Sequence, residues 1–318
     1  MTPAEMPFGV VVNPRSALGR GARAARRVLA AFTSFGIPAV EIRGADADGC
    51  RAAVREACAR GLRGLVLVGG DGLLGLVLQL PEARALPIGI VPAGSGNDFA
   101  RQFGIGAHPA RAVRRILDAE PQPRRVDLGV VTFGSDGATP ARAPGTPSGV
   151  ASREDREHWF AGGLSVGFDA AINRRANAMR LPTGPFRYHL ALLGELVTLR
   201  SRQFTVATTG VAHQYTGLLA TVMNIRAIGG GIPLAPHASP TDGRLDLVEV
   251  SNSSSLRVFS VLGLLARGTH ERLPEVTITR VTSVRIDAGA EIAYADGERV
   301  GVGPFTVRAA PGALVLLA

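Results

Sequence analysis

One short stretch constrains the fold of this chain more than any other: an apolar run, Leu65–Val68, followed at once by the turn GGDG at 69–72. Four apolar residues bounded by glycines predict a buried strand, and the apolar run that begins at Leu73 predicts a helix. Glycines let a phosphate approach the backbone because no Cβ intervenes. A helix start also directs unpaired N–H groups at the turn. The stretch therefore predicts a strand–loop–helix unit able to hold an anion.

Asp71 is the unexpected residue of this turn, because a bare carboxylate repels phosphate. It could act through a divalent cation, or it could accept a proton from an attacking hydroxyl. The structural alternative is an N-cap of the helix that follows. The residues of the turn alone leave these roles open.

The order of strand, loop and helix recurs through residues 1–126. Strands are expected at 8–12, 39–42, 65–68 and 88–91. Such alternation predicts a doubly wound parallel sheet, in which ligands bind beyond the carboxyl ends of the strands. The loop with NPRS at Asn13, the GGDG turn and the loop PAGSGNDFAR at Pro92 should therefore meet at one edge of the sheet. The segment GRGARA at Gly19 does not follow its strand directly, so we do not expect a dinucleotide fingerprint there.

The pattern changes after Val126. Short β-type runs dominate residues 127–318 and predict a mainly antiparallel β domain. Within it, residues 132–156 are rich in Gly, Pro, Ala, Ser and Thr and are expected to form a mobile loop. The predicted domains are thus an α/β domain at 1–126 and a β domain at 127–318.

Composition narrows the class of protein. Hydrophobic residues make up 46% of the chain, and no apolar run reaches the roughly 18 residues of a membrane span. The first residues have no basic segment followed by an apolar stretch, so no signal peptide is expected. The two cysteines, Cys50 and Cys58, fall in one expected helix. They indicate reduced thiols in a cytoplasmic protein.

All basic side chains are arginines, because the sequence contains no lysine, and the formal net charge is +9. A Walker lysine, a Schiff-base lysine and a lysine general base are therefore excluded. Aromatic residues are sparse and no nucleic-acid-binding pattern is present, so we expect no nucleic-acid partner. An anionic membrane surface fits the charge, and a codon bias towards arginine is the alternative explanation.

The ordered motifs resemble those of the diacylglycerol kinase catalytic family, which includes bacterial soluble lipid kinases and sphingosine kinases. The matching segments follow the family's order over nearly the whole chain. They are NPRS at Asn13, GGDG at Gly69, PAGSGNDFAR at Pro92, VDLG at Val126, VGFDA at Val166, GGGIPLAP at Gly229, DGRLD at Asp242 and DGE at Asp296. The resemblance implies an α/β ATP-binding domain and a C-terminal β-sandwich domain with an active site in the cleft between them. It also implies transfer of the ATP γ-phosphoryl group to a lipid hydroxyl, with diacylglycerol as the first candidate.

The resemblance also implies roles for individual residues. Those expected to face ATP are Asn13, Pro14, Ser16, Gly69, Gly70, Asp71, Gly72, Gly94, Ser95, Asn97 and Asp98. Asp242 corresponds to a magnesium-site residue, beside the carbonyls of Ser239 and Arg244, and Asp127 can join through water. Glu298 corresponds to the general base of the bacterial enzymes. In sphingosine kinases the GGDG aspartate, here Asp71, has that role, so both carboxylates are kept.

The resemblance further implies a lipid alcohol at the membrane surface as substrate, and a cytoplasmic protein that associates peripherally with an anionic membrane. A sphingoid base or another lipid alcohol remains an alternative acceptor. The oligomeric state is open, a homodimer being one option. The sequence departs from the bacterial pattern at Leu73 and Leu76, where Thr and Glu are usual. That departure puts the ATP contacts in question and keeps a non-catalytic nucleotide- or lipid-binding protein in view.

Two other enzyme classes share single motifs with the chain. Gly163–Gly167 reads G-x-S-x-G, and Ser165, Asp246 and His270 follow the chain order of an α/β-hydrolase triad. The strand before Ser165 is weak and lies in the β region, which argues against a nucleophile elbow. NAD kinases share GGDG, but their downstream segment is missing here.

Overall fold

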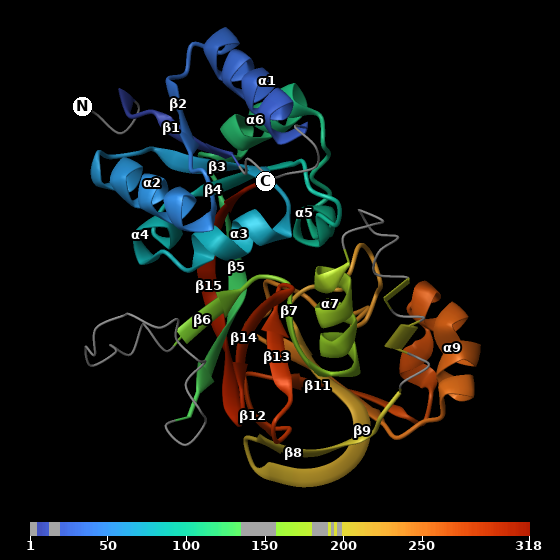
Figure 1. Ribbon diagram of the computed structural model, residues 1–318. Coiled ribbons are helices and arrows are strands. Elements are labelled where there is room, and N and C mark those ends of the chain that lie inside the picture. The colour runs from blue at the N-terminus through green and yellow to red at the C-terminus, as the bar shows by residue number, and fades with distance from the viewer. Residues whose placement is uncertain (1–4, 13–19, 135–156, 180–189, 192–193, 196–198) are drawn as a thin grey trace. The chain divides into compact units, whose positions relative to one another are not determined.

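The computed structural model describes residues 5–12, 20–134, 157–179, 190–191, 194–195 and 199–318 (Figure 1). Asn13, Pro14 and Ser16 lie outside the described residues, and so do residues 135–156 of the expected mobile loop. The chain divides into two compact units. The first unit is Met1–Val126 together with Pro311–Ala318, and the second is Asp127–Ala310.

A parallel sheet forms the centre of the first unit. Its strands are β1 (Phe8–Val12), β2 (Ala39–Arg43), β3 (Gly64–Gly69) and β4 (Ile88–Pro92), in the spatial order β2-β1-β3-β4. Every residue of β1, β3 and β4 is buried. These strands are rich in Val, Leu and Ile without alternating polar residues because the sheet is covered on both faces, as the sequence predicts.

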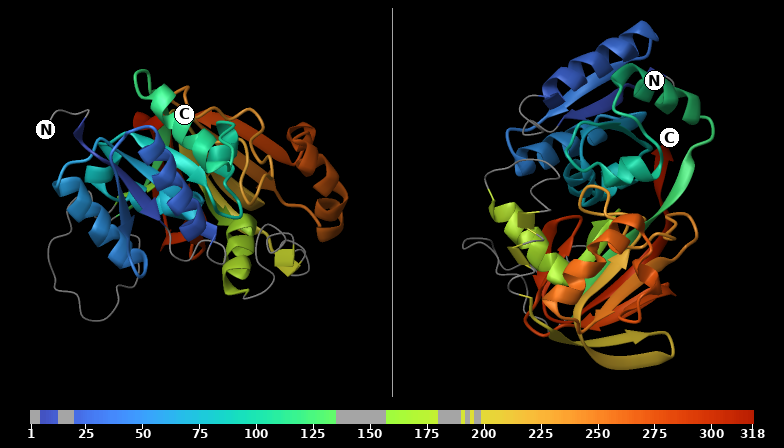
Figure 2. Two further views of the ribbon diagram at one scale, coloured as in Figure 1. Left: turned by 90° about the horizontal axis from the view of Figure 1, so that it is seen from above. Right: turned by 90° about the vertical axis from the view of Figure 1, so that its right-hand side faces the viewer.

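Helices cover both faces of this sheet, so the predicted doubly wound α/β fold is confirmed (Figure 1). On one face α1 (Arg20–Ser34) and α6 (Pro109–Ala119) pack side by side, as both views in Figure 2 also show. The other face carries α2 (Ala47–Ala59), α3 (Asp71–Leu78) and α4 (Pro81–Arg84). The short α5 (Asp98–Gln102) follows β4. Amphipathic spacing explains α1, because Ala25, Val28 and Phe32 fall on one side and enter the core.

The last strand, β15 (Phe305–Leu317), belongs to both units. Its first part pairs antiparallel with β12 (Ser283–Asp287), whereas Leu316 and Leu317 pair in parallel with Ile88 and Gly89 of β4. The expected second domain, 127–318, therefore differs from the second unit by residues 311–318. The reason is that Leu316 and Leu317, both buried, pair with the edge strand β4 of the parallel sheet.

The second unit is built from antiparallel strands, as predicted for a β-sandwich-like domain. One path runs β14 (Glu298–Val302), β13 (Ile292–Ala295), β7 (Gly163–Gly167), β9 (Val211–Met223), β8 (Arg202–Thr208), β12 and β15. From β9, pairing continues to β10 (Leu245–Ser251) and β11 (Val276–Val281), and β5 (Arg124–Phe133) pairs with β6 (Glu157–Phe160). Phe160, Phe204 and Phe305 are fully buried in its core.

The helical segments of this unit whose bounds are described include α7 (Phe168–Ala178), α9 (Ser255–Arg267) and the 3₁₀ turn η3 (His270–Arg272). The helix α7 follows β7 directly and packs on β7, β9 and β13. Among the residues that the structure describes, no helix is both long enough and apolar enough to cross a bilayer.

The shared strand gives a test of the division into units. Leu316→Ala removes a fully buried side chain beside β4, and such truncations cost about 2–5 kcal/mol. We expect amide exchange to accelerate in β4 while β7 stays protected. Thr306→Ala, in the part of β15 that pairs with β12, is the matched control and should leave β4 unchanged. A loss of protection in β7 instead would contradict the assignment of residues 311–318 to the first unit.

Candidate active site

Two of the expected glycine loops touch in the first unit. The N–H of Ala93 donates to the carbonyl of Gly69 at 2.8 Å. A Cβ built on Gly94 would lie 2.5 Å from the Cα of Gly70, so no other residue fits at this approach. The glycines of the two loops therefore have a packing reason besides any contact with a ligand. Gly72 differs, because it is exposed and a Cβ there would meet no atom within 4 Å.

The carboxylate of Asp71 joins the two loops. Its Oδ2 accepts the N–H of Asp98 at 3.0 Å, and its Oδ1 accepts the N–H of Phe99 at 3.1 Å. These are orphan donors at the start of α5, so Asp71 caps a helix. The sequence-based alternative placed Asp71 at the N-cap of α3, the helix that follows it. Gly70 occupies that position, and Asp71 instead caps α5. The aspartate of GGDG thus positions the loop that follows β4.

The second loop is closed by Asn97. Its backbone is left-handed, with φ at 55°, and its side chain accepts from the N–H of Gly94 and donates to the carbonyl of Gly94. Ser95, at the tip, is exposed. Asp98 is buried and forms an ion pair with Arg101. The loop therefore presents one free hydroxyl, from Ser95, at a rigid turn.

An acidic turn in the second unit is held by Asp127. Asp127 is buried, its Oδ2 accepts the N–H of Gly243 at 2.6 Å, and its own N–H donates to the carbonyl of Pro240 at 2.8 Å. Asp242 is exposed on this turn, and its Oδ1 accepts the N–H of Arg244 at 3.0 Å. Asp127 therefore holds the turn in place by hydrogen bonds, and Asp242 is the carboxylate that the turn exposes to solvent.

A buried carboxylate lies next to this turn. Desolvation raises the pKa of Asp246, and the negative charge of Asp242 adds to that effect, while Arg280 opposes it. Asp242 and Asp246 therefore interact electrostatically. Within the described part of the chain, no group of three or more His, Cys, Asp or Glu side chains is arranged to hold a metal. Any ion at the turn would rely on Asp242 with carbonyls such as those of Ser239 and Arg244, and with water.

Glu298 is presented by a tight hairpin. It pairs with Ala295 across β13 and β14, and Asp296 and Gly297 form the two-residue turn with φ at 47° and 84°. Positive φ at both central positions is the hairpin geometry that an Asp-Gly pair favours. The side chain of Glu298 is exposed. The DGE segment is therefore the β-turn that its dipeptide predicts, and it carries a free carboxylate directly after the turn.

Asp296 fixes this hairpin to the segment before β7. Its carboxylate accepts the N–H groups of Ala161 at 2.8 Å, Gly162 at 2.8 Å and Gly163 at 3.1 Å. The N–H of Asp296 returns a hydrogen bond to the carbonyl of Gly163 at 3.0 Å. Because one side chain holds three donors, the position of Glu298 is tied to residues 161–163.

Asn224 connects this hairpin to the acidic turn. It is 1% exposed, and its Nδ2 donates to the carbonyls of Asp127 and Ala161, each at 2.8 Å. The sequence-based site did not include Asn224. The signal was an amide directly after the run LLATVM at 218–223, which is apolar except for Thr221, because a buried polar group there needs partners. Asp127, Asn224 and Asp296 therefore form one hydrogen-bonded network within the second unit.

Asp169 is a second residue that the sequence-based site omitted. It follows β7, and its carboxyl group is enclosed although the residue as a whole is partly accessible. Desolvation raises the pKa of Asp169 to about 6, against hydrogen bonds from Thr221, Ser165 and the N–H of Ala170. A carboxyl group with this pKa lies near the midpoint of its titration at mildly acidic pH.

The structure does not support the alternative of an α/β-hydrolase triad. Ser165 is buried in the middle of the antiparallel strand β7 and hydrogen-bonds Asp169. His270 is buried and hydrogen-bonds the carbonyl of Leu234 at 3.0 Å, and the charged groups that act on Asp246 include Arg280 and Asp242. A nucleophile elbow needs a strand-to-helix turn at the serine, which the structure does not have at this position.

Packing explains why the sequence departs from the bacterial pattern at Leu73. Leu73 is 2% exposed and lies against Gly69, where a Cβ would come within 2.8 Å of its Cδ2. The side chain belongs to the core beneath the GGDG turn. An apolar residue at this position is therefore a packing choice, and it leaves the loop backbone free to meet a ligand. Leu76, one turn further along α3, is partly exposed.

Comparison with known proteins identifies the family of this chain. Residues 7–131 match the diacylglycerol kinase catalytic domain, and residues 162–318 match the YegS C-terminal NAD kinase beta sandwich-like domain. The chain belongs to the diacylglycerol kinase family and is a lipid kinase of the diacylglycerol kinase and YegS type.

Individual relatives support this membership. A diacylglycerol kinase of Mycobacterium tuberculosis (strain ATCC 25618 / H37Rv) is 32% identical over 308 residues, covering 96% of this chain and 93% of the relative. A diacylglycerol kinase of Bacillus subtilis (strain 168) is 24% identical and covers 79% and 76%. The crystal structure of a diacylglycerol kinase from Bacillus anthracis str. Sterne has the same fold. Its TM-score is 0.67, its sequence identity is 14%, and 98% and 96% of the two chains are covered.

Asp169 predicts a pH dependence of stability. Its pKa of about 6 in the folded protein exceeds the ordinary value of 3.8, so the folded state binds the proton more tightly than the unfolded state. Stabilisation by this proton is complete below pH 4 and is lost as the pH rises through 6. The loss is about 3 kcal/mol at most. Asp169→Asn should flatten the curve of unfolding free energy between pH 4 and 7, whereas the exposed-turn variant Asp287→Asn should not. Parallel curves for wild type and Asp169→Asn would contradict the assignment.

The three hydrogen bonds of Asp296 predict a large cost for their removal. Asp296→Ala leaves three N–H groups of residues 161–163 without their acceptor, and each unsatisfied buried donor costs about 1–3 kcal/mol. Urea unfolding should show a loss of several kcal/mol. Asp287→Ala removes one hydrogen bond, from the N–H of Gly289, in an exposed turn and should cost far less. Equal costs for the two variants would show that the network does not hold the hairpin.

Proposed function

We propose that this lipid kinase transfers the γ-phosphoryl group of ATP to a lipid hydroxyl, with diacylglycerol as the acceptor. The observation that carries the proposal is the division of the signature carboxylates into two kinds. Asp71, Asp127 and Asp296 accept backbone N–H groups of distant segments, whereas Asp242 and Glu298 are exposed and Asp242 accepts only the N–H of Arg244, two residues further on. Phosphoryl transfer needs positioned loops, a hard cation and an activator of the hydroxyl more than it needs a covalent nucleophile.

The proposed reaction uses Glu298 as general base. Its carboxylate takes the proton of the lipid hydroxyl while the oxygen bonds to the γ-phosphorus and the bond from that phosphorus to the β–γ bridging oxygen breaks. The products are a phosphorylated lipid and ADP. Exposure suits Glu298 for this role because a base must reach its substrate. Asp71 already accepts two backbone hydrogen bonds, so its proposed role is to position the nucleotide loops.

The donor set at the acidic turn fits magnesium. Mg²⁺ favours oxygen ligands and keeps several waters, so one or two carboxylates suffice. Asp242 offers an exposed carboxylate, and the carbonyls of Ser239 and Arg244 lie on the same turn. When bound, Mg²⁺ would neutralise charge on the transferred phosphoryl group. Asp127 contributes by holding the turn through the N–H of Gly243.

The nucleotide loops supply backbone N–H groups and one hydroxyl. The N–H groups at the start of α3 and the Ser95 hydroxyl are the donors available for phosphate oxygens. Neither group is removed by Leu73, because that side chain points into the core. The apolar residue in place of the usual Thr is therefore compatible with ATP use.

The acceptor is tested by direct phosphorylation. Purified protein with Mg²⁺ and labelled ATP is offered micellar diacylglycerol, sphingosine or NAD in parallel. Labelled phosphatidic acid supports the proposal. Labelling of sphingosine alone would show that a sphingoid base is the acceptor in place of diacylglycerol. Labelling of NAD alone would overturn the lipid-kinase assignment. Binding of ATP without transfer to any acceptor would leave a non-catalytic protein.

Two variants separate the base from the positioning carboxylate. We expect Glu298→Gln to lower kcat by about 100-fold or more with little change in the KM for ATP. Asp71→Asn should lower kcat by a similar factor and also raise the KM for ATP, because it loosens the start of α5. Glu56→Gln, on the exposed side of α2, is the control and should keep wild-type kinetics. Near-wild-type rates in both site variants would show that the assigned residues are wrong.

A further inference from the structure

The outward side of α1 carries arginines that lack acidic partners. Arg23, Arg26 and Arg27 are exposed, and α1 contains no acidic residue. Over the described parts of the chain, none of the three forms an ion pair. The helix α2 on the opposite face behaves differently. Its Arg51 and Arg55 pair with Asp48 and Glu82, and Arg60 beyond its end pairs with Glu56. A general preference for arginine over lysine does not explain this contrast, because both helices belong to one sequence.

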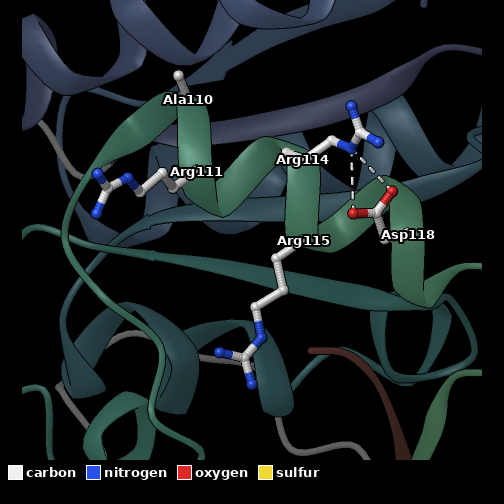
Figure 3. A pocket seen from close by; sticks show the side chains of 5 residues that line it. All are labelled: Ala110, Arg111, Arg114, Arg115 and Asp118. Atoms are coloured by element: carbon white, nitrogen blue, oxygen red, sulfur yellow. Dashed lines mark hydrogen bonds and ion pairs between the residues drawn. The ribbon is translucent and has the colours of Figure 1, made fainter.

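The neighbouring helix α6 adds a hollow edged by arginines. Arg111, Arg114 and Arg115 surround a space of about 420 Å³ together with Ala110 and Asp118 (Figure 3). Arg114 turns back to Asp118, with Nε 3.0 and 3.1 Å from the two carboxylate oxygens, while Arg111 and Arg115 extend away from this pair. Arg115 donates to the carbonyls of Gly104 and Phe103. Arg111 has no ion-pair partner among the described residues.

An aromatic ring at the end of α1 contacts an arginine of α6. Phe35, directly after α1, is 41% exposed, and the guanidinium of Arg114 on α6 lies 5.9 Å from the centre of its ring. The helices α1 and α6 pack side by side (Figure 2), and the contact of Arg114 with Phe35 joins the end of α1 to α6. We define the α1–α6 arginine surface as Arg23, Arg26, Arg27, Arg111, Arg114 and Phe35.

We propose that the α1–α6 arginine surface docks on an anionic membrane. Guanidinium groups bind phosphate oxygens in a bidentate manner and are weakly hydrated, which suits them to lipid phosphates at an interface. An anionic leaflet attracts basic residues within a Debye length of its surface. The exposed ring of Phe35 beside Arg114 adds an apolar group of the kind that enters the interfacial region. The choice of partner rests on the proposed function, because a lipid acceptor resides in the membrane.

The test measures binding to vesicles of pure phosphatidylcholine and to vesicles in which a third of the lipid is phosphatidylglycerol. Each arginine near an anionic surface contributes a factor of about five to the partition coefficient. The double variant Arg23→Gln/Arg27→Gln should therefore bind the anionic vesicles about 25-fold more weakly. The matched control Arg51→Gln/Arg55→Gln removes the same charge from the opposite face of the sheet and should bind like wild type. Binding of wild type should also weaken as salt is raised.

Two results would overturn the proposal. One is equal binding of wild type to neutral and anionic vesicles, and the other is equal loss in the two double variants. If Arg23→Gln/Arg27→Gln bound vesicles like wild type but lost binding to duplex DNA, the surface would instead be assigned to nucleic acid. The KM for ATP should be unchanged in this variant, and a raised KM would assign the arginines to the nucleotide.

The membrane proposal and the proposed function fail in different ways. Phosphorylation of a short-chain, water-soluble diacylglycerol does not need docking, so its rate should be the same in wild type and Arg23→Gln/Arg27→Gln. Vesicle binding that depends on the arginines, without transfer to any lipid, would refute the proposed function and keep the docking surface. Transfer to the soluble lipid without vesicle binding would support the proposed function and refute the docking surface.

Discussion

The structure depends most on hydrogen bonds between aspartate carboxylates and backbone N–H groups of a separate segment. Asp71 holds the start of α5, Asp127 holds the turn at Gly243, and Asp296 holds residues 161–163. Loops cannot satisfy these donors by regular pairing, and an unsatisfied buried N–H is costly. A carboxylate can accept several of them at once. In each case a signature aspartate joins two loops that are distant in sequence.

This use of aspartate changes how the signature motifs are understood. An Asp within a signature turn suggests a catalytic or metal-binding group, and the sequence alone favours that role for Asp71 and Asp127. The geometry shows both carboxylates engaged with the backbone, so their direct effect is on loop position. Asp242 and Glu298 are the acidic groups that the same loops present to solvent. The carboxylates that join distant segments are therefore different from the two that the turns expose to solvent.

Much of the fold was predictable because its signals are local. Buried apolar runs marked β1, β3 and β4, and the Asp296–Gly297 pair marked a hairpin. Asn224 and Asp169 were missed because their importance comes from partners that are far away in the sequence. The placement of residues 311–318 was missed for the same reason, since a short apolar run at the end of a chain does not state which sheet it joins. The target of the Asp71 cap likewise depends on which loop lies beside it.

The crossing of β15 between the units has a consequence for synthesis. Residues 311–318 complete the edge of the first sheet beside Ile88, and they are translated only after the whole second unit. A nascent chain thus emerges from the ribosome with β4 as an open edge, which is a template for unwanted pairing. That edge stays open through translation of the entire second unit. Synthesis of the first unit therefore begins before that of the second unit and is completed after it.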